Sequence, residues 1–210
     1  MKQFRRVTGI LFVILGLGLL IASGSLLIYN QQEAEQADEA AEAAMESLSE
    51  AIEERIHTRE PEESSMYQDP LEPEVYGPMD TVEIDGILYI GYLSIPVLDL
   101  DLPVMSEWSY EGLNIAPGRF YGDPRTHDFV IAAHNYTRHF GSLNRLSPGD
   151  TILFTDVNDH IYTYKVEDLE ILPPDAVKEM TSGSYDLSLF TCTYDGRTRL
   201  TVRCMETDPQ

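Results

Sequence analysis

The stretch SLFTCTYDGRTRLTVRC, residues 188–204, carries the strongest fold signal in this sequence. Two runs of β-branched and aromatic residues flank Asp195-Gly196, a dipeptide that favours a two-residue hairpin turn. With these two residues as the turn, Cys192 lies directly opposite Arg199. Directly paired side chains share one face of the sheet, with Cβ atoms about 4.5–5.5 Å apart. The register therefore predicts a guanidinium beside a thiol.

A thiol in this position has a possible chemical role. A permanent cation beside it favours the thiolate, and the cation can donate to the oxyanion that forms when sulfur attacks a carbonyl. The alternative is that Cys192 is a small buried hydrophobe and Arg199 an ordinary surface charge. The same register pairs Cys204 with Leu187 on the opposite face, too far from Cys192 for a disulfide. We expect Cys192 to be a free thiol and Cys204 to be structural.

A thiol nucleophile also needs an acid and base, and His134 is the best placed histidine. It ends the apolar run FVIAAH (129–134) and precedes Asn135, so a rigid strand would deliver it to a loop edge. The remaining histidines are expected to face solvent: His57, His127, His139 and His160.

Outward from the hairpin, the chain after Thr81 consists of short runs of strand length, each bounded by turn residues. The runs are ILYIGYLSIP (87–96), FVIAAH (129–134), TILFTDV (151–157), HIYTYKVEDLEIL (160–172), LSLFTCTY (187–194) and RLTVRCM (199–205). Many short strands predict a closed barrel or a sandwich. Short helical turns are expected over 174–180 and 138–146.

The first thirty residues indicate a membrane anchor. Residues 7–29 contain no charge, and 23 residues of helix are long enough to cross a bilayer. A cleaved signal peptide is the alternative, but its apolar region is usually shorter. Because Lys2, Arg5 and Arg6 precede the run, the N-terminus is expected in the cytoplasm and the chain after Asn30 outside the cell.

Two segments of different composition connect this anchor to the strands. Residues 31–60 are rich in Ala and Glu and predict an acidic helical stalk, with a two-heptad coiled coil as the alternative. Residues 61–80 hold four prolines and predict an extended linker. The apolar stripe of the stalk consists of Ala41, Met45, Leu48, Ile52 and Ile56. The predicted divisions are 1–30 for the cytoplasmic tip and anchor, 31–80 for stalk and linker, and 81–210 for the catalytic domain.

Charge and cysteine content exclude other classes of function. The net charge is -22, and basic residues are clustered only within the first six positions, so nucleic acid is not an expected partner. Two cysteines are too few for a disulfide scaffold and are not spaced as a zinc motif. No ordered calcium-ligand run is present, and we expect neither a metal nor another cofactor.

Three blocks, in this order after an apolar N-terminus, resemble the sortase family of Gram-positive cysteine transpeptidases. They are YIGYLSIPVLDLDLPV (89–104), FVIAAHNY (129–136) with FGSLNRLSPGDTI (140–152), and SLFTC (188–192) followed by RLTV (199–202). The resemblance covers about residues 89–205. Thr191 matches the family's TLxTC motif, although Ser188 replaces its first threonine. The blocks look closer to class B than to class A, but the Cys-to-Arg spacing is short for a class B hairpin, so the class stays open.

The resemblance implies a mainly β fold, namely a closed eight-stranded β-barrel with short helices. It also implies a nucleophilic role for Cys192, an acid and base role for His134, and a substrate and oxyanion contact for Arg199. Thr191 and Asn135 are expected to contact substrate. Two other arginines compete for the third role: Arg197 lies beside the turn, and Arg203 lies four positions beyond Arg199. Only Arg199 stands in the RLTV context that resembles the family.

The activity implied is cleavage of a C-terminal LPXTG-like sorting motif through a cysteine thioester. The expected partners are surface proteins with that motif, an amine of a cell-wall peptide precursor or of a pilin, and membrane lipid around the N-terminal helix. Specificity is expected in the loops 108–123 and 172–185. The alternatives are a cysteine peptidase, an L,D-transpeptidase, although its SHGC-type motif is absent, and a non-catalytic membrane-tethered binding module.

Overall fold

The computed structural model describes residues 2–58, 76–182, 184–193 and 195–207. Most of the predicted Pro-rich linker lies outside these residues. The chain divides into two compact units, Met1–Ala37 and Asp38–Gln210. Within Phe12–Thr58, the helix that begins at Lys2 contains an 18-residue window of mean hydropathy 2.3, none of it buried. This long apolar helix is consistent with the predicted membrane anchor.

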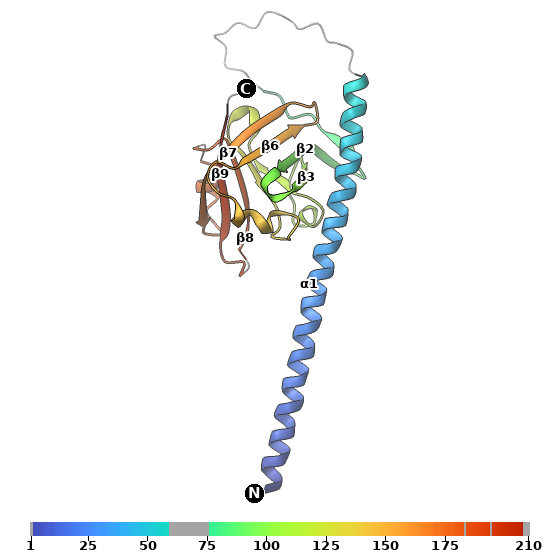
Figure 1. Ribbon diagram of the computed structural model, residues 1–210, viewed down its shortest axis with the longest axis vertical. Coiled ribbons are helices and arrows are strands. Elements are labelled where there is room, and N and C mark those ends of the chain that lie inside the picture. Colours follow the sequence, from blue (N-terminus) through green and yellow to red (C-terminus); the bar gives the residue numbers. More distant parts are fainter. Residues whose placement is uncertain (1, 59–75, 183, 194, 208–210) are drawn as a thin grey trace, which may run out of the picture. The chain divides into compact units, whose positions relative to one another are not determined.

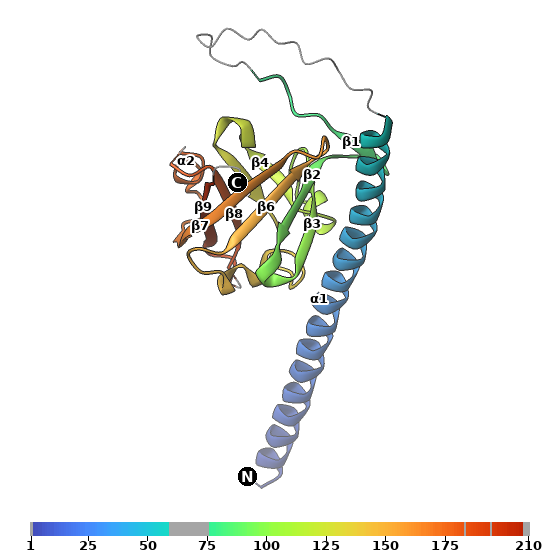
Figure 2. The same ribbon diagram turned by 45° about the horizontal axis from the view of Figure 1, so that its top comes forward.

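The second unit is built on strands that close into a barrel (Figures 1 and 2). Neighbouring strands follow the order β1-β2-β3-β4-β5-β8-β9-β7-β6, and a further pairing of β2 with β6 closes eight of them into a ring. The strands are β1 (Val82–Ile84), β2 (Ile87–Ile95), β3 (Leu100–Met105), β4 (Gly118–Tyr121), β5 (Phe129–Ala132), β6 (Thr151–Asp156), β7 (Ile161–Leu172), β8 (Leu187–Cys192) and β9 (Arg199–Glu206). The predicted closed eight-stranded barrel is therefore confirmed.

Two strand pairs in the barrel are parallel, β3 with β4 and β5 with β8, and the others are antiparallel. The strands that sequence patterns did not separate are β1, β3 and β4. They are short or contain residues that interrupt a strand pattern, such as Asp101 and Pro103 in β3 and Gly118 in β4. Each of them pairs with strands adjacent to it along the chain: β1 and β3 with β2, and β4 with β3 and β5.

The long helix is α1 (Lys2–Thr58), and the other described helices are short. They are α2 (Val177–Met180) and the 3-10 turns η1 (Pro96–Leu98), η2 (Gly112–Asn114), η3 (Pro124–Thr126) and η4 (Phe140–Arg145). The turns predicted over 174–180 and 138–146 correspond to α2 and η4. In η4, Phe140 and Leu143 are fully buried, so this turn closes one end of the barrel core.

Every second side chain along each strand points into the barrel, and these side chains form the core. Fully buried examples are Phe129 and Ile131 of β5 and Ile152 and Phe154 of β6. The rings of Phe129 and Phe154 meet edge to face, with centroids 5.0 Å apart. The β5 residues that alternate with Phe129 and Ile131 therefore point to the outer face of the barrel wall. The candidate site lies on that face.

Residues 38–58 of α1 pack against the outside of this barrel, whereas a solvated helix was expected. Leu48 and Ile52 are buried in a cluster with Tyr89 and Met105 of the barrel. Ala41 and Ala44 are buried too, whereas Ile56 is 44% exposed. Helices in proteins gain most of their stability from tertiary packing of an apolar face, and the barrel offers the apolar surface against which this segment packs.

We expect Ile52→Ala to lower the free energy of unfolding by about 2–5 kcal/mol, because it removes buried atoms and leaves a cavity. Ile56→Ala, the same change one helical turn away, should cost less than about 1 kcal/mol because Ile56 is largely exposed. The measurement is urea unfolding of the full chain in detergent, followed by the fluorescence of Trp108, the only tryptophan. Equal losses in the two variants would mean that this face of the helix is not packed.

Candidate active site

The β8–β9 hairpin has the register that the sequence predicts. Cys192 pairs with Arg199, and Leu187 pairs with Cys204 at the other end. The turn is closed by backbone hydrogen bonds from Thr193 N to Thr198 O at 3.0 Å and from Gly196 N to Thr193 O at 2.8 Å. Gly196 has a φ of +70°, a conformation that favours glycine.

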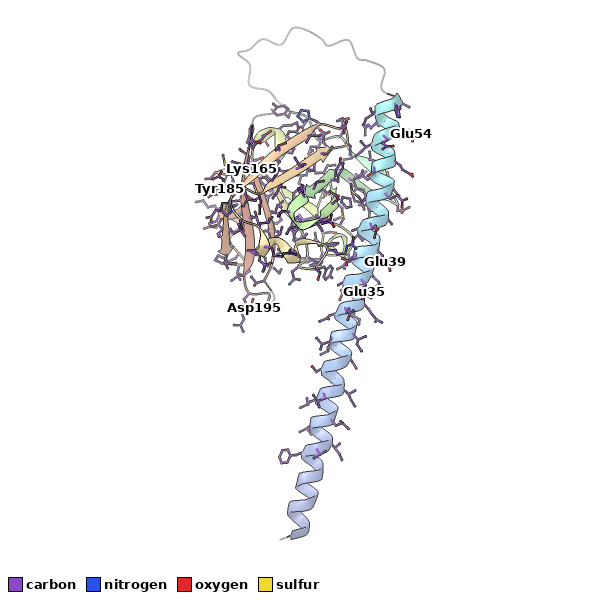
Figure 3. All side chains as sticks on the ribbon, in the orientation of Figure 1. Glu35, Glu39, Glu54, Lys165, Tyr185 and Asp195 are labelled. Atoms are coloured by element: carbon purple, nitrogen blue, oxygen red, sulfur yellow. The ribbon has the colours of Figure 1, made fainter. Side chains whose placement is uncertain are left out.

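Side-chain bonds brace the tip of this hairpin. The Thr193 hydroxyl donates to Asp195 Oδ1 at 2.7 Å and accepts from the backbone N–H of Thr198 at 3.2 Å. Figure 3 shows Asp195 projecting beyond the barrel at the end of the hairpin. The tip is thus tied together locally, and the strand residues next to it, Cys192 and Arg199, are held in a fixed register.

The parallel pairing of β5 with β8 brings the histidine to the cysteine. Ala132 pairs with Phe190, and the N–H of Ala133 donates to the carbonyl of Phe190 at 3.2 Å. His134 and Cys192 each lie two positions beyond this pair in their own strand direction. Since neighbouring strands are about 4.8 Å apart, His134, which follows the end of β5, lies beside the end of β8 at Cys192.

A compact loop holds the backbone of His134. Its carbonyl accepts from Phe140 N at 3.1 Å, and the carbonyl of Tyr136 accepts from Gly141 N at 2.9 Å. A Cβ at residue 141 would lie 2.6 Å from the carbonyl oxygens of Asn135 and Tyr136, so this close approach requires glycine. The loop therefore follows one tight path back to η4.

The ring of Tyr136 packs on the imidazole. The centroids of His134 and Tyr136 are 5.0 Å apart, and the Tyr136 hydroxyl donates to Asn114 Oδ1 at 3.1 Å. The ring of Tyr136 also meets the ring of His139, with centroids 5.5 Å apart. These contacts limit the orientations open to His134.

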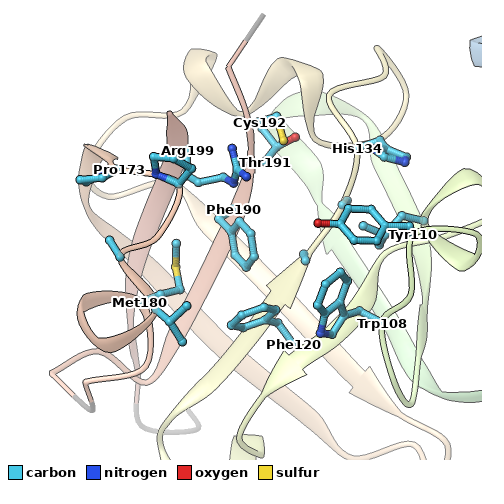
Figure 4. Close-up of a pocket in the computed structure, with 16 residues that line it drawn as sticks. Trp108, Tyr110, Phe120, His134, Pro173, Met180, Phe190, Thr191, Cys192 and Arg199 are labelled. Carbon is cyan, nitrogen blue, oxygen red and sulfur yellow. The ribbon is translucent and has the colours of Figure 1, made fainter. Parts of the chain in front are cut away.

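A pocket of about 320 Å³ on the outer face of the barrel brings the predicted residues together. His134, Cys192, Arg199 and Thr191 all line it. Figure 4 shows Cys192 between His134 and Arg199, with the guanidinium extended toward Cys192 and Thr191. Asn135 is half-buried and is not among the residues that line this pocket in the described part of the chain.

Thr191 and Cys192 point to different sides of the strand. The Thr191 hydroxyl is buried and has no hydrogen-bond partner among the described residues. Cys192 is partly exposed, as is Arg199. At this end of β8, the Cys192 thiol therefore faces the pocket, whereas the Thr191 hydroxyl does not.

Aromatic side chains form one wall of the pocket. Phe120 meets Phe190 edge to face at 5.1 Å, and Trp108 stacks at a tilt on Phe120 at 5.5 Å. Tyr110 lies against Trp108 at the rim and is 76% exposed. Phe190 shares the face of Cys192 by strand alternation, a signal that the sequence contained and that our sequence analysis did not use.

The opposite wall comes from the connection between β7 and β8. Pro173, Pro174, Ala176, Val177 and Met180 line the pocket from this side. Apart from Phe190 of β8, the residues named in the two walls fall within the predicted specificity loops, 108–123 and 172–185. A mostly apolar pocket with a thiol, an imidazole and a guanidinium at one end suits a peptide whose side chains are apolar near the reacting carbonyl.

The three arginines of the hairpin have different surroundings. Arg199 donates to the carbonyl oxygen of Thr198 at 3.1 Å and lies beside the pocket. Arg197 is exposed and lies at the turn. Arg203 is buried and forms an ion pair with Glu170 at 2.6 Å, away from the pocket lining. Of the three, Arg199 alone lines the pocket.

The two cysteines also differ in their surroundings. Both are free thiols, and Cys204 is fully buried in the barrel core. Burial raises the pKa of the Cys204 thiol, because a thiolate is disfavoured away from water. Cys204 is therefore an unreactive packing residue, as its register predicted.

The other histidines lie away from Cys192 and Arg199. His57, His127 and His160 are exposed, as predicted. His139 is fully buried, so its prediction as a solvent-facing residue was wrong. The reason is that the loop after His134 turns toward the core at the buried Phe140, so that the ring of His139 packs against Tyr136.

No group of three or more His, Cys, Asp and Glu side chains is arranged to hold a metal ion within residues 2–58, 76–182, 184–193 and 195–207. The pocket itself offers a thiol, an imidazole and a guanidinium. These groups suit acyl transfer, in which sulfur attacks a carbonyl and a base handles the proton.

Comparisons with known proteins agree on one family. Residues 93–207 match the Sortase domain family, which is more than half of the chain. No curated protein sequence matches. Among solved structures, sortase C1 from Streptococcus agalactiae is 26% identical and covers 61% of this chain and 72% of its own, with a TM-score of 0.52. A Clostridium perfringens sortase D5 transpeptidase is 16% identical and covers 82% of this chain and 99% of its own, with a TM-score of 0.56, a likeness of fold.

We expect iodoacetamide at neutral pH to add a single carbamidomethyl group to the folded full chain. The label should lie on Cys192, because Cys204 is fully buried. Intact mass and peptide mapping make the measurement, and unfolding in guanidinium should make both cysteines reactive. Cys192→Ser should leave the folded chain unlabelled. Labelling of Cys204 at a similar rate would contradict the assigned surroundings of the two thiols.

Proposed function

The chain belongs to the sortase family and is a cysteine transpeptidase, and from this premise we propose that it cleaves an LPXTG-like sorting motif and transfers the protein to an amine. The observation that carries this proposal is the position of Cys192. The parallel β5–β8 pairing places it beside His134, and the antiparallel β8–β9 pairing places it opposite Arg199. The three groups line one pocket.

In the first step, the Cys192 thiolate attacks the carbonyl carbon of the scissile amide. A C–S bond forms, and the carbonyl oxygen takes the negative charge that the Arg199 guanidinium stabilises. His134 then gives its proton to the amide nitrogen as the C–N bond breaks. The products are a thioester on Cys192 and a free amine on the released fragment.

In the second step, an acceptor amine attacks the thioester carbon. His134 takes a proton from that amine, and the C–S bond breaks to restore the Cys192 thiolate. The substrate protein is left joined to the acceptor by a new amide bond. We propose that the acceptor is an amine of a cell-wall peptide precursor or of a pilin.

The apolar walls of the pocket support recognition of a peptide with apolar residues before the scissile bond. Trp108 and Phe120 on one side and Val177 and Met180 on the other would contact such side chains. Thr191 remains a proposed substrate contact through its backbone, since its hydroxyl is buried. Asn135 is proposed as a contact for substrate groups that extend past His134.

We propose that the apolar helix anchors the chain with the N-terminus in the cytoplasm and the barrel outside. Lys2, Arg5 and Arg6 precede the apolar run, which favours this orientation. In this division residues 1–30 are the tip and anchor, 31–80 connect, and 81–210 carry the site. Sorting substrates would be tethered to the same membrane, and this confinement raises their effective concentration at the pocket.

The test incubates the full chain in detergent with a panel of sorting-motif peptides, with and without an added amine, and records intact mass. We expect a Cys192-dependent adduct that the amine converts to an amide product. An adduct that only hydrolyses would instead favour a peptidase. If no peptide forms an adduct although iodoacetamide labels Cys192 quickly, the site is reactive but the proposed motif class is wrong.

Three variants assign the roles in this assay. Cys192→Ala should abolish the adduct, and His134→Ala should lower turnover by about 10²–10⁴-fold through loss of the acid and base. Arg199→Met should lower it by about 10²–10³-fold through loss of the oxyanion contact. Arg197→Met is the matched control, because Arg197 is exposed on the same hairpin, and it should retain activity. Normal turnover in Cys192→Ala would end the mechanism.

A further inference from the structure

Arg203 is a buried cation that the proposed reaction does not use. It lies on β9 opposite Ser188, and strand alternation places it on the same outer face as Arg199 and Cys192. It is only 4% exposed and does not line the pocket. Burying a guanidinium is costly unless every part of it is paired, so its partners indicate what it does.

The guanidinium binds in three directions. Nε donates to Glu170 Oε1 on β7 at 2.6 Å, and Nη1 donates to Ser188 Oγ on β8 at 2.8 Å. The remaining bonds reach the end of α2: Nη2 donates to the Glu179 carbonyl at 2.8 Å and Nη1 to the Met180 carbonyl at 3.2 Å. Arg203 therefore joins two barrel strands to α2.

The segment that Arg203 holds is the wall of the candidate pocket opposite the aromatic residues. Among the described residues, the backbone hydrogen bonds of residues 173–181 run inside the segment, such as Met180 N to Ala176 O at 3.0 Å and Thr181 N to Val177 O at 3.0 Å. These bonds shape the segment but do not attach it to the barrel. Among the hydrogen bonds of the described residues, those from Arg203 to the carbonyls of Glu179 and Met180 join the segment to the barrel.

We propose that Arg203 is a positioning residue that fixes the α2 wall of the pocket and thereby sets the affinity for the peptide substrate. The inference rests on the proposed function for the identity of that substrate. Arg203 links the α2 segment to β7. Val177 and Met180 of that segment line the pocket, and Glu170 of β7 neutralises the buried guanidinium. Cys192 and His134 are held by the β5–β8 ladder instead, so the reacting groups do not depend on Arg203.

Arginine is suited to this task and lysine is not. Its planar fork presents donors in fixed directions, so that one side chain can reach a carboxylate, a hydroxyl and two carbonyls together. A lysine at the same position would keep the charge but could not span all these acceptors. The ring of Tyr185 lies 5.3 Å from the guanidinium carbon and covers it from the side of the β7–β8 connection.

Hydrogen exchange tests the link without any substrate. In the full chain with Arg203→Met, the amides of Met180 and Thr181 should exchange about tenfold faster or more, because α2 is no longer held. The amides of Leu189 and Val202 in the barrel should keep their wild-type rates. Arg203→Lys should give an intermediate increase, and Arg197→Met, the exposed control, should give none.

Steady-state kinetics test the consequence for the substrate. In Arg203→Met, KM for the sorting peptide should rise about tenfold while kcat changes by less than about threefold. The rate at which iodoacetamide labels Cys192 should stay at the wild-type value, since that reagent does not need the α2 wall. Glu170→Gln should also raise KM for the sorting peptide, but by a smaller factor than Arg203→Met.

Two results would overturn the proposal. Unchanged exchange at Met180 and Thr181 in Arg203→Met would show that Arg203 does not hold α2. An increase spread equally over α2, β8 and β9, with slower labelling of Cys192, would show general destabilisation instead of positioning. If the wild-type chain forms no adduct with any peptide, the proposed function fails, and the exchange measurement still decides whether Arg203 holds the wall.

Discussion

The hydrogen-bond ladder that joins β5, β8 and β9 positions the chemical groups of this protein. Cys192 ends the middle strand, and its neighbours are a parallel strand on one side and an antiparallel strand on the other. The parallel neighbour delivers His134 at the same level, and the antiparallel neighbour delivers Arg199 directly opposite. Backbone pairing thus places the thiol, the imidazole and the guanidinium at one level, and the side chains need little further support to share a pocket.

Strand alternation divides the same residues between two environments. Inward-facing positions of β8 and β9 fill the barrel core and include Cys204, whereas outward-facing positions form the floor of the pocket and include Cys192. A shift of the register by one residue would exchange the two sets. The closed barrel prevents such a shift, because every strand is paired on both sides. One strand register therefore places Cys192 at the pocket and buries Cys204 in the core.

The outer face of the barrel is also where the remaining elements attach. Residues 38–58 of α1 cover Tyr89 and Met105, and the same cluster includes Leu113, which lines the pocket. On the other side, α2 is tied to the barrel by Arg203. Trp108 and Tyr110 of one pocket wall and the α2 segment of the other thus lie in connections between strands, whereas Cys192 and Arg199 lie on β8 and β9.

The sequence predicted the apolar N-terminal helix and the β8–β9 register from local signals, because an uncharged run and a turn dipeptide each act within a few residues. The short strands alone fitted a closed barrel or a sandwich, and the resemblance to the sortase family favoured the barrel. The same resemblance made Cys192, His134 and Arg199 the candidate site residues. The tertiary structure alone decided three other features: the burial of His139, the packing of Leu48 and Ile52 on the barrel, and the link from Arg203 to α2. Each of these depends on which surfaces meet when segments distant in sequence come together. A short sequence pattern cannot specify these contacts, because it does not show which other segment of the folded chain will pack against it.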